Sequence, residues 1–231
     1  MAFGRARASF PRGMDVSGRR LVVFDFDGTL SNTIQGITTT ARTVLRNHGL
    51  SDADMGDLRR IVGPPFPEAF SMVYGLSETE AAQVTEEYRA IYSTLGPEAF
   101  PAIPGTIELA DSLRAAGKVL AVASSKRASL LERGMRESGL APHFDVFLGK
   151  LDDGDDTKPK TIGRVMERIG LGPEDAVMVG DRFYDVDAAA EVGMPCAGVH
   201  YARTCDVEEL WEAGAVAVAE TVDDLARVLL G

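Results

Sequence analysis

The sequence predicts an α/β protein, a doubly wound parallel sheet covered by helices, with an all-helical segment inserted into it. Short and nearly continuous apolar runs alternate with amphipathic stretches along much of the chain, as expected for parallel strands that are covered on both faces. Helical patterns continue between residues 33 and 104, but no such apolar run occurs there. Polar residues follow several of the runs directly, where open α/β sheets bind their ligands.

Six apolar runs are the expected strands. The first, LVVFDFD, is followed by runs at residues 118–125, 144–149, 175–181, 195–200 and 215–220. The segments between them repeat apolar residues at helical spacing, which predicts helices over residues 106–116, 126–138, 158–169 and 185–192.

We expect three parts in the chain. Residues 1–19 are rich in Arg, Gly and Ser and lack the apolar centre of a secretory signal, so a flexible N-terminal tail is expected there. Residues 20–32 and 105–231 form the α/β core. Residues 33–104 form a helical domain, in which Ser77 and Glu80 fit a capping box.

Composition limits the classes of partner. The formal net charge of -11 over 231 residues argues against nucleic acid and anionic membranes, and no apolar run is long enough to span a bilayer. The two cysteines, Cys196 and Cys205, have no metal-ligand spacing and give no disulfide framework. We therefore expect a cytoplasmic protein, either a monomer or a homodimer.

Two carboxylates at the end of the first strand need an explanation. Asp25 and Asp27 are one residue apart, so their side chains share one side if the strand geometry persists to its end. Like charges at the edge of an apolar segment repel each other and resist burial. A bound cation is the simplest arrangement that makes this pair favourable.

Further strand ends supply partners for that cation. Asp181 and Asp185 follow the fourth run, and with Asp25 and Asp27 they offer only hard oxygen ligands. This ligand chemistry suits Mg²⁺, or Ca²⁺ and Mn²⁺, and does not suit zinc.

A phosphoryl group would complete the set. It would use the Ser124 hydroxyl beside Ser125, backbone N–H groups at Gly28 and Thr29, and the charge of Lys158, with Lys160 as a second candidate lysine. One carboxylate can attack phosphorus while its neighbour transfers protons. We therefore expect a small phosphorylated metabolite as the partner.

Four stretches, in this order, resemble the motifs of the haloacid dehalogenase-like (HAD) hydrolases: DFDGTL at 25–30, LAVASSK ending at 126, Lys158, and VGDRFYDVDAA at 179–189. The resemblance implies a Rossmann-like HAD core with a helical cap domain between the first two motifs. It is strongest to phosphoglycolate phosphatases and 5′-nucleotidase-like members, whose cap pattern Gly63-Pro-Pro-Phe66 and Phe70 resemble. Ser125 departs from the Asn of many members.

The resemblance also implies roles for the motif residues. Asp25 would be the nucleophile, and Asp27 the general acid and base that also binds the metal through its backbone carbonyl. The family's dehalogenases carry no Asp at the position of Asp27, which favours a phosphatase or a phosphomutase. Ser124 would hold the phosphoryl group, Lys158 would neutralise charge, and Asp181 and Asp185 would complete the Mg²⁺ site.

The expected function is a Mg²⁺-dependent phosphatase that hydrolyses a small phosphomonoester, phosphoglycolate- or nucleotide-like, through an aspartyl-phosphate intermediate. A β-phosphoglucomutase-like phosphomutase and a non-hydrolytic phospho-Asp signalling module are the alternatives. Arg89 and Arg182 contact a substrate anion or lie at the surface. The acidic run 152–156 is expected to be a solvated loop. Aromatic and Met side chains either form the core of the helical domain or line a pocket: Phe66, Phe70, Met72, Tyr74, Tyr88 and Tyr92.

Overall fold

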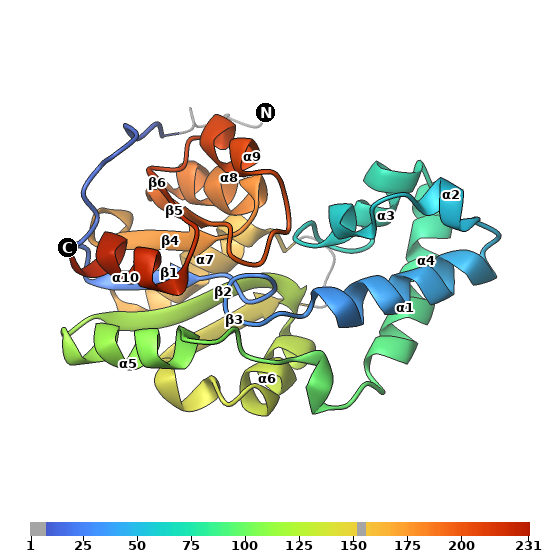
Figure 1. The fold of residues 1–231 in the computed structure, drawn as a ribbon, viewed down its shortest axis with the longest axis horizontal. Coiled ribbons are helices and arrows are strands. Elements are labelled where there is room, and N and C mark those ends of the chain that lie inside the picture. Colours follow the sequence, from blue (N-terminus) through green and yellow to red (C-terminus); the bar gives the residue numbers. More distant parts are fainter. Residues whose placement is uncertain (1–7, 152–155) are drawn as a thin grey trace.

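A six-stranded parallel sheet with helices on both faces forms the centre of the molecule (Figure 1). The computed structural model describes residues 8–151 and 156–231. The strand order is β3-β2-β1-β4-β5-β6, and every hydrogen-bonded pair is parallel. The predicted doubly wound α/β class is therefore confirmed. The strands are β1 (Leu21–Phe24), β2 (Val119–Arg127), β3 (Val146–Lys150), β4 (Ala176–Gly180), β5 (Cys196–Val199) and β6 (Ala217–Ala219).

Side chains of β1 alternate between two cores, one on each face of the sheet. Val22 and Phe24 belong to one buried cluster, and Leu21 and Val23 belong to the other, because successive side chains of a strand point to opposite faces. The helices that cover the first face are α5 (Thr106–Ala115), α6 (Ala128–Glu137) and α10 (Val222–Leu230). Those covering the second are α7 (Lys158–Ile169), α8 (Phe183–Val192) and α9 (Val207–Ala213).

The direction of the sheet order reverses at β1. The chain proceeds from β1 to β2 and β3 on one side and from β4 to β6 on the other. An open α/β sheet forms a crevice at the carboxyl ends of the strands where this reversal occurs. Since β1 ends at Phe24, Asp25 is the first residue beyond the strand in that crevice.

All elements between β1 and β2 before α5 are helical and lie to one side of the sheet, on the right in Figure 1. They are α1 (Ile34–Asn47), α2 (Asp52–Met55), η1 (Leu58–Ile61), α3 (Glu68–Tyr74), α4 (Glu78–Tyr92) and η2 (Pro97–Ala99). Ser77 and Glu80 form the predicted capping box at the start of α4. The two connectors to this helical segment run together, because the Asn32 N–H donates to the Pro101 carbonyl at 2.9 Å.

The segment from Ala8 to Arg19 packs on the core, although the sequence analysis expects a flexible tail over residues 1–19. Val16 is buried, and the Gly13 N–H donates to the Val216 carbonyl at 2.7 Å. The Arg12 guanidinium lies 3.6 Å from the centre of the Trp211 ring. An apolar residue and a cation above an aromatic ring thus fix a stretch whose composition resembles a tail. Residues 1–7 lie outside the described part.

The acidic run 152–156 differs from expectation at its last residue. Asp156 is buried, where it forms an ion pair with Arg164 at 2.7 Å and accepts the Leu151 N–H at 2.8 Å. These partners keep the carboxylate out of solvent, which charge patterning along the sequence does not reveal. The other four residues of the run lie outside the described residues.

Over residues 8–151 and 156–231, no helix combines the length and the apolarity that a membrane span requires.

Tight packing at α6 gives a test of the fold. A Cβ at Gly134 would lie 2.8 Å from two atoms of the Phe26 ring, and Phe26 is fully buried. We expect Gly134→Ala to lower the free energy of unfolding by about 1–3 kcal/mol through overpacking. A Cβ at Gly163 in α7 would have no neighbouring atom within 4 Å, so Gly163→Ala should raise the free energy of unfolding by about 0.5–1 kcal/mol.

Urea unfolding monitored by circular dichroism compares the two variants with the wild type. The same gain in both would show that the Phe26 ring moves aside, and would contradict the packing described at α6.

Candidate active site

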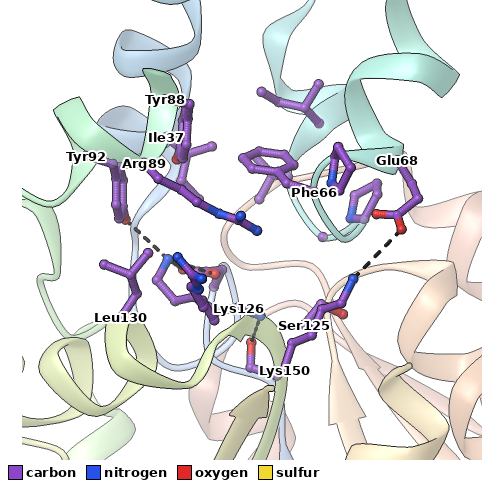
Figure 2. Close-up of a pocket in the computed structure, with 18 of the residues that line it drawn as sticks. Ile37, Phe66, Glu68, Tyr88, Arg89, Tyr92, Ser125, Lys126, Leu130 and Lys150 are labelled. Atoms are coloured by element: carbon purple, nitrogen blue, oxygen red, sulfur yellow. Dashed lines mark hydrogen bonds and ion pairs between the residues drawn. The ribbon is translucent and has the colours of Figure 1, made fainter. Parts of the chain in front are cut away.

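Polar side chains near the ends of β1, β2 and β3 line one cavity of ≈ 310 Å³ between the sheet and the helical segment (Figure 2). Asp25 and Asp27 follow β1, and Ser124 and Ser125 lie near the end of β2. The opposite wall comes from the helical segment, and Arg89 extends from α4 into the cavity. The cavity therefore joins three of the predicted catalytic residues, Asp25, Asp27 and Ser124, to residues inserted between β1 and β2.

Aromatic residues of the helical segment serve both purposes considered in the sequence analysis. Tyr88 stacks on Tyr92 with ring centres 5.3 Å apart, and Phe66 contacts Tyr88 edge-on at 4.9 Å. These three rings also line the cavity. Phe70 is fully buried beneath them, whereas Met72 is exposed. The core of the helical segment is thus at the same time the wall of the cavity.

Asp27 has a lysine of its own, which the sequence analysis does not anticipate. Lys126 Nζ lies 2.9 Å and 3.1 Å from the two Asp27 carboxylate oxygens, and the Thr33 hydroxyl donates to Oδ1 at 2.6 Å. Lys126 also donates to the Tyr92 hydroxyl at 3.3 Å. Burial by itself lowers the pKa of Lys126, but the facing Asp27 carboxylate raises it overall. Asp27 is therefore held by a permanent charge.

The position of Lys126 depends on an irregularity in β2. The predicted strand stops at Ser125, but β2 continues to Arg127, and its pairing with β3 shifts register between Ala123 and Arg127. Such a shift re-aims side chains beside a site. The buried Ser124 hydroxyl accepts the Lys126 N–H at 3.3 Å, and Ser124 and Lys126 both line the cavity. Strand-end reasoning that is carried one residue further would have found Lys126.

Asp25 is buried beside Lys158, the predicted lysine. Lys158 begins α7, and its ammonium lies 2.9 Å from Asp25 Oδ1 and also contacts Asp185. Lys160 is exposed, so of the two lysines considered in the sequence analysis it is Lys158 that lies at the site. Burial is the largest influence on Asp25 and raises its pKa to about 6, against the attraction of Lys158. Burial also opposes the charge of Lys158, but its two carboxylate partners raise its pKa overall.

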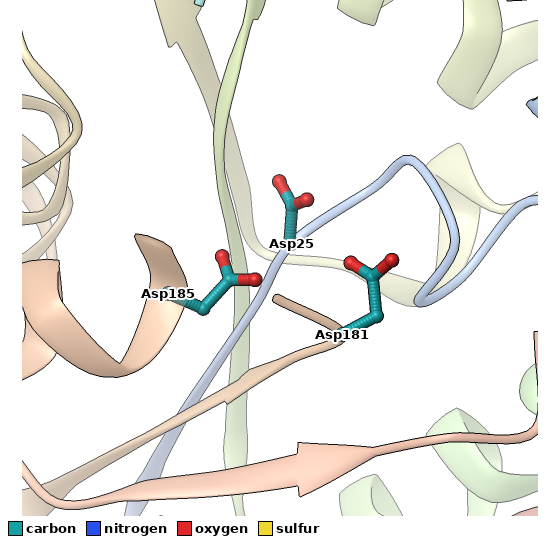
Figure 3. Close-up of side chains that lie close together, drawn as sticks. All are labelled: Asp25, Asp181 and Asp185. Atoms are coloured by element: carbon teal, nitrogen blue, oxygen red, sulfur yellow. The ribbon is translucent and has the colours of Figure 1, made fainter. Parts of the chain in front are cut away.

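The two partners of this lysine, Asp25 and Asp185, lie close to a third carboxylate, that of Asp181 (Figure 3). Asp25 follows β1, Asp181 follows β4, and Asp185 lies in the first turn of α8; each offers an oxygen within 4.8 Å of the others. Burial, together with the charges of Asp185 and Asp25, raises the pKa of Asp181. Asp27 is not in this group, since its carboxylate pairs with Lys126.

The donor set fits a divalent cation. All three side chains offer hard oxygen atoms, as Mg²⁺ prefers. Asp181 Oδ2 is buried, and no hydrogen-bond donor among the described residues reaches it. A buried carboxylate oxygen without a donor is unfavourable unless a cation or a proton satisfies it. Asp25, Asp181 and Asp185 are therefore the residues that could hold a metal.

Gly28 and Thr29 lie beside Asp181 and do not line the cavity. The Gly28 N–H already donates to the Ser31 carbonyl at 2.8 Å and that of Thr29 to the Phe26 carbonyl at 3.4 Å, so the turn itself consumes the donors expected for a phosphoryl group. The Thr29 hydroxyl instead donates to Asp181 Oδ1 at 3.3 Å. Gly28 has a φ of +77°, and a Cβ there would collide with the Asp181 carboxylate.

Known proteins match most of this chain in sequence. The family model "Haloacid dehalogenase-like hydrolase" matches residues 22–199. A "5'-nucleotidase" from Pseudomonas aeruginosa is 32% identical over 181 residues, which is 78% of this chain and 82% of that protein. "Tyrosine-protein kinase PtkA" from Mycobacterium tuberculosis is 37% identical over 214 residues, 91% of this chain and 72% of the other.

A solved structure agrees with these sequence matches. The crystal structure of a protein described as a "predicted phosphatase" from Clostridium acetobutylicum superposes with a TM-score of 0.86 at 33% identity, covering 92% of this chain and 98% of the other. The resemblance noted in the four sequence motifs is thereby confirmed. The chain is an enzyme that belongs to the haloacid dehalogenase-like hydrolases.

Proposed function

We propose that this chain is a Mg²⁺-dependent phosphatase that hydrolyses a small phosphomonoester through an aspartyl phosphate on Asp25. One observation carries the proposal. Asp25 lines the cavity together with Ser124, and it lies beside Lys158 and the carboxylates of Asp181 and Asp185. A buried carboxylate with cationic neighbours is suited to attack an electron-poor phosphorus atom.

The chemistry divides between the two carboxylates that follow β1. A carboxylate oxygen of Asp25 attacks phosphorus, and the bond from phosphorus to the ester oxygen breaks. Asp27 gives a proton to the departing oxygen, so an alcohol leaves. Water then attacks the phosphorus of the aspartyl phosphate while Asp27 takes its proton, which releases phosphate and restores Asp25. Ser124 and Lys158 would hold the phosphoryl oxygens throughout.

Asp25, Asp181 and Asp185 would hold the Mg²⁺ ion, together with the backbone carbonyl of Asp27. When bound, the ion supplies positive charge that offsets the carboxylates and the phosphoryl oxygens. When ionised, these three carboxylates and Lys158 together carry two net negative charges, which a divalent cation balances.

We further propose that residues 33–104 act as a cap domain over the site. They provide the wall opposite Asp25, including Phe66, Tyr88 and Arg89. A volume of ≈ 310 Å³ lies at the lower end of the range for ligand pockets. This size favours a small leaving group, such as that of a phosphoglycolate- or nucleotide-like ester, bound between aromatic rings and a guanidinium.

Phosphoryl transfer to another acceptor is the second candidate function. The observation in its favour is the 37% identity to a relative named a tyrosine-protein kinase. An aspartyl phosphate on Asp25 would serve either reaction, and the acceptor, water or a hydroxyl group, decides between them. A phosphomutase belongs to the same class of alternatives.

Loss of the Asp25 carboxylate tests the proposed reaction. We expect the wild type to release phosphate in Mg²⁺ from at least one ester in a panel of 2-phosphoglycolate, nucleoside monophosphates, hexose phosphates, phosphotyrosine and p-nitrophenyl phosphate. Asp25→Asn removes the nucleophile, so release should fall by a factor on the order of 10⁴ or more. Asp223→Asn, at an exposed position in α10, is the matched control and should keep full activity.

Separate outcomes distinguish the candidates. Activity that persists in Asp25→Asn would contradict the mechanism. If no ester is hydrolysed, radiolabelled ATP with a tyrosine peptide, or a hexose bisphosphate, would detect transfer to a hydroxyl group in place of water.

Metal binding gives a second test that needs no substrate. Because Asp181 Oδ2 is buried without a donor among the described residues, we expect Mg²⁺ to raise the Tm of the wild type by several degrees, as about 2–3 kcal/mol of binding free energy would produce. Asp181→Asn should abolish this increase, whereas Asp223→Asn should not. Differential scanning calorimetry with and without EDTA measures both, and an equal increase in all three proteins would exclude Asp181 as a ligand.

The pH dependence of that stabilisation has a definite sign. Burial raises the pKa of Asp25 to about 6 in the metal-free protein, so below this value a proton occupies the carboxylate and Mg²⁺ must displace it. The Mg²⁺-induced rise in Tm should therefore shrink as pH falls from about 7.5 to about 5.5. In Asp25→Asn this pH dependence should be weaker, and what remains is due to Asp181, whose pKa is also raised by burial. An undiminished rise at the lower pH would contradict the role of Asp25 as a ligand.

A further inference from the structure

Arg182 joins the metal-binding end of β4 to the helical segment. It follows Asp181 directly, and its side chain is only 7% exposed. Its Nε donates to Glu209 Oε1 in α9 at 2.8 Å. Its Nη1 donates to the backbone carbonyl of Val62 and, more weakly at 3.5 Å, to that of Arg59. The sequence left Arg182 between a substrate contact and a surface residue, and neither description fits a buried link of this kind.

The loop that Arg182 holds is a wall of the candidate active site. Val62, Gly63 and Pro64 follow η1 and line the cavity that contains Asp25 and Asp27. Arg182 itself is not among the residues that line it. Arg182 therefore lies behind the wall and acts on it from outside the cavity.

Gly63 shows how closely the loop and Arg182 pack. Its φ is +102°, a conformation that side chains rarely adopt, and a Cβ there would lie 2.8 Å from Arg182 Cγ. The stem of Arg182 thus fills the place that any larger residue at position 63 would need. The positive φ and the close packing against Arg182 both favour glycine at position 63.

The Nε and Nη1 atoms of the guanidinium both have acceptors in this position. Glu209 balances its charge and also accepts the Phe183 N–H at 3.2 Å, while the Val62 carbonyl accepts from the other side. The Arg182 backbone N–H donates to Asp185 Oδ2 at 3.0 Å. Arg182 therefore contacts the Asp185 carboxylate through its backbone and the Val62 carbonyl of the cavity wall through its side chain.

We infer that Arg182 is a positioning residue that docks the Val62–Pro64 loop onto the core and thereby limits the size of the leaving group that the cavity accepts. The docking is independent of the reaction, whereas the size limit rests on the proposed phosphatase function. The guanidinium makes no contact with the phosphoryl group in this account. Its loss should therefore change which esters are accepted more than how phosphate itself is bound.

Hydrogen exchange tests the docking without any substrate. Arg182→Met keeps the stem but removes the donors, and Gly63→Ala places a Cβ against Arg182. We expect either change to speed amide exchange of residues 58–63 by about 10-fold or more, because the loop opens locally more often. Exchange in β1 should not change. Arg46→Met, at an exposed arginine of the same helical segment, is the control and should behave as the wild type.

Two exchange results would overturn the docking. Residues 58–63 in Arg182→Met could exchange at the wild-type rate, which would mean that the loop needs no support from Arg182. Alternatively, exchange could accelerate equally throughout the sheet, which would mean that Arg182 contributes only to global stability.

Substrate selectivity tests the size limit. For Arg182→Met we expect kcat/KM for a bulky ester to rise relative to a compact one by about 5- to 10-fold, mainly through KM. Inhibition by inorganic phosphate should stay within about 2-fold of the wild type, because the phosphoryl site is untouched. A uniform fall for every ester would overturn the size limit. If the wild type hydrolyses no ester, the phosphatase proposal fails by itself, and the exchange rates still decide whether Arg182 docks the loop.

Discussion

The fold must keep three like charges buried within contact distance of one another, and much of the architecture follows from that requirement. At an effective dielectric constant of about 20, two carboxylates 4–5 Å apart repel by roughly 3–4 kcal/mol. One lysine among Asp25, Asp181 and Asp185 offsets only part of this repulsion. Burial is the main cause of the raised pKa values of Asp25 and Asp181, and the repulsion between the carboxylates adds to it. A group with this excess of negative charge is stable when a cation or protons are added to it, so the same charges that strain the metal-free fold prepare it for a ligand.

Two glycines leave room for the carboxylates of this cluster. A Cβ at Gly28 would collide with the Asp181 carboxylate, and one at Gly180 would collide with that of Asp185. Both glycines lie beside the acids whose room they provide. The parallel sheet brings the acids together because Asp25 and Asp181 follow adjacent strands, β1 and β4, that end at the same edge. Local chain conformation and sheet topology therefore both contribute to the position of the carboxylates.

Strand-end reasoning predicted the fold class and brought Asp25, Asp181, Asp185, Ser124 and Lys158 to one place, because apolar runs and the polar residues after them are local features of the sequence. It failed in three places, for reasons that apolar patterns along the sequence do not show. The N–H groups of Gly28 and Thr29 are consumed by their own turn. Lys126 was overlooked because β2 continues past its predicted end. The burial of Arg182 depends on a loop more than a hundred residues away, about which periodicity says nothing.

A regular strand would place the side chains of Asp25 and Asp27 on one side, next to each other, but the structure separates their surroundings. Because β1 ends at Phe24, the two acids enter different surroundings: Asp25 pairs with Lys158 beside the metal group, and Asp27 pairs with Lys126 and, through it, Tyr92 of α4. The two carboxylates are thus held by different parts of the molecule although they are neighbours in sequence. Under the proposed mechanism, the nucleophile and the proton-transferring group would therefore each have a lysine of its own. Tyr92 of α4 contacts the second pair through Lys126, so a displacement of α4 would act on the partner of Asp27.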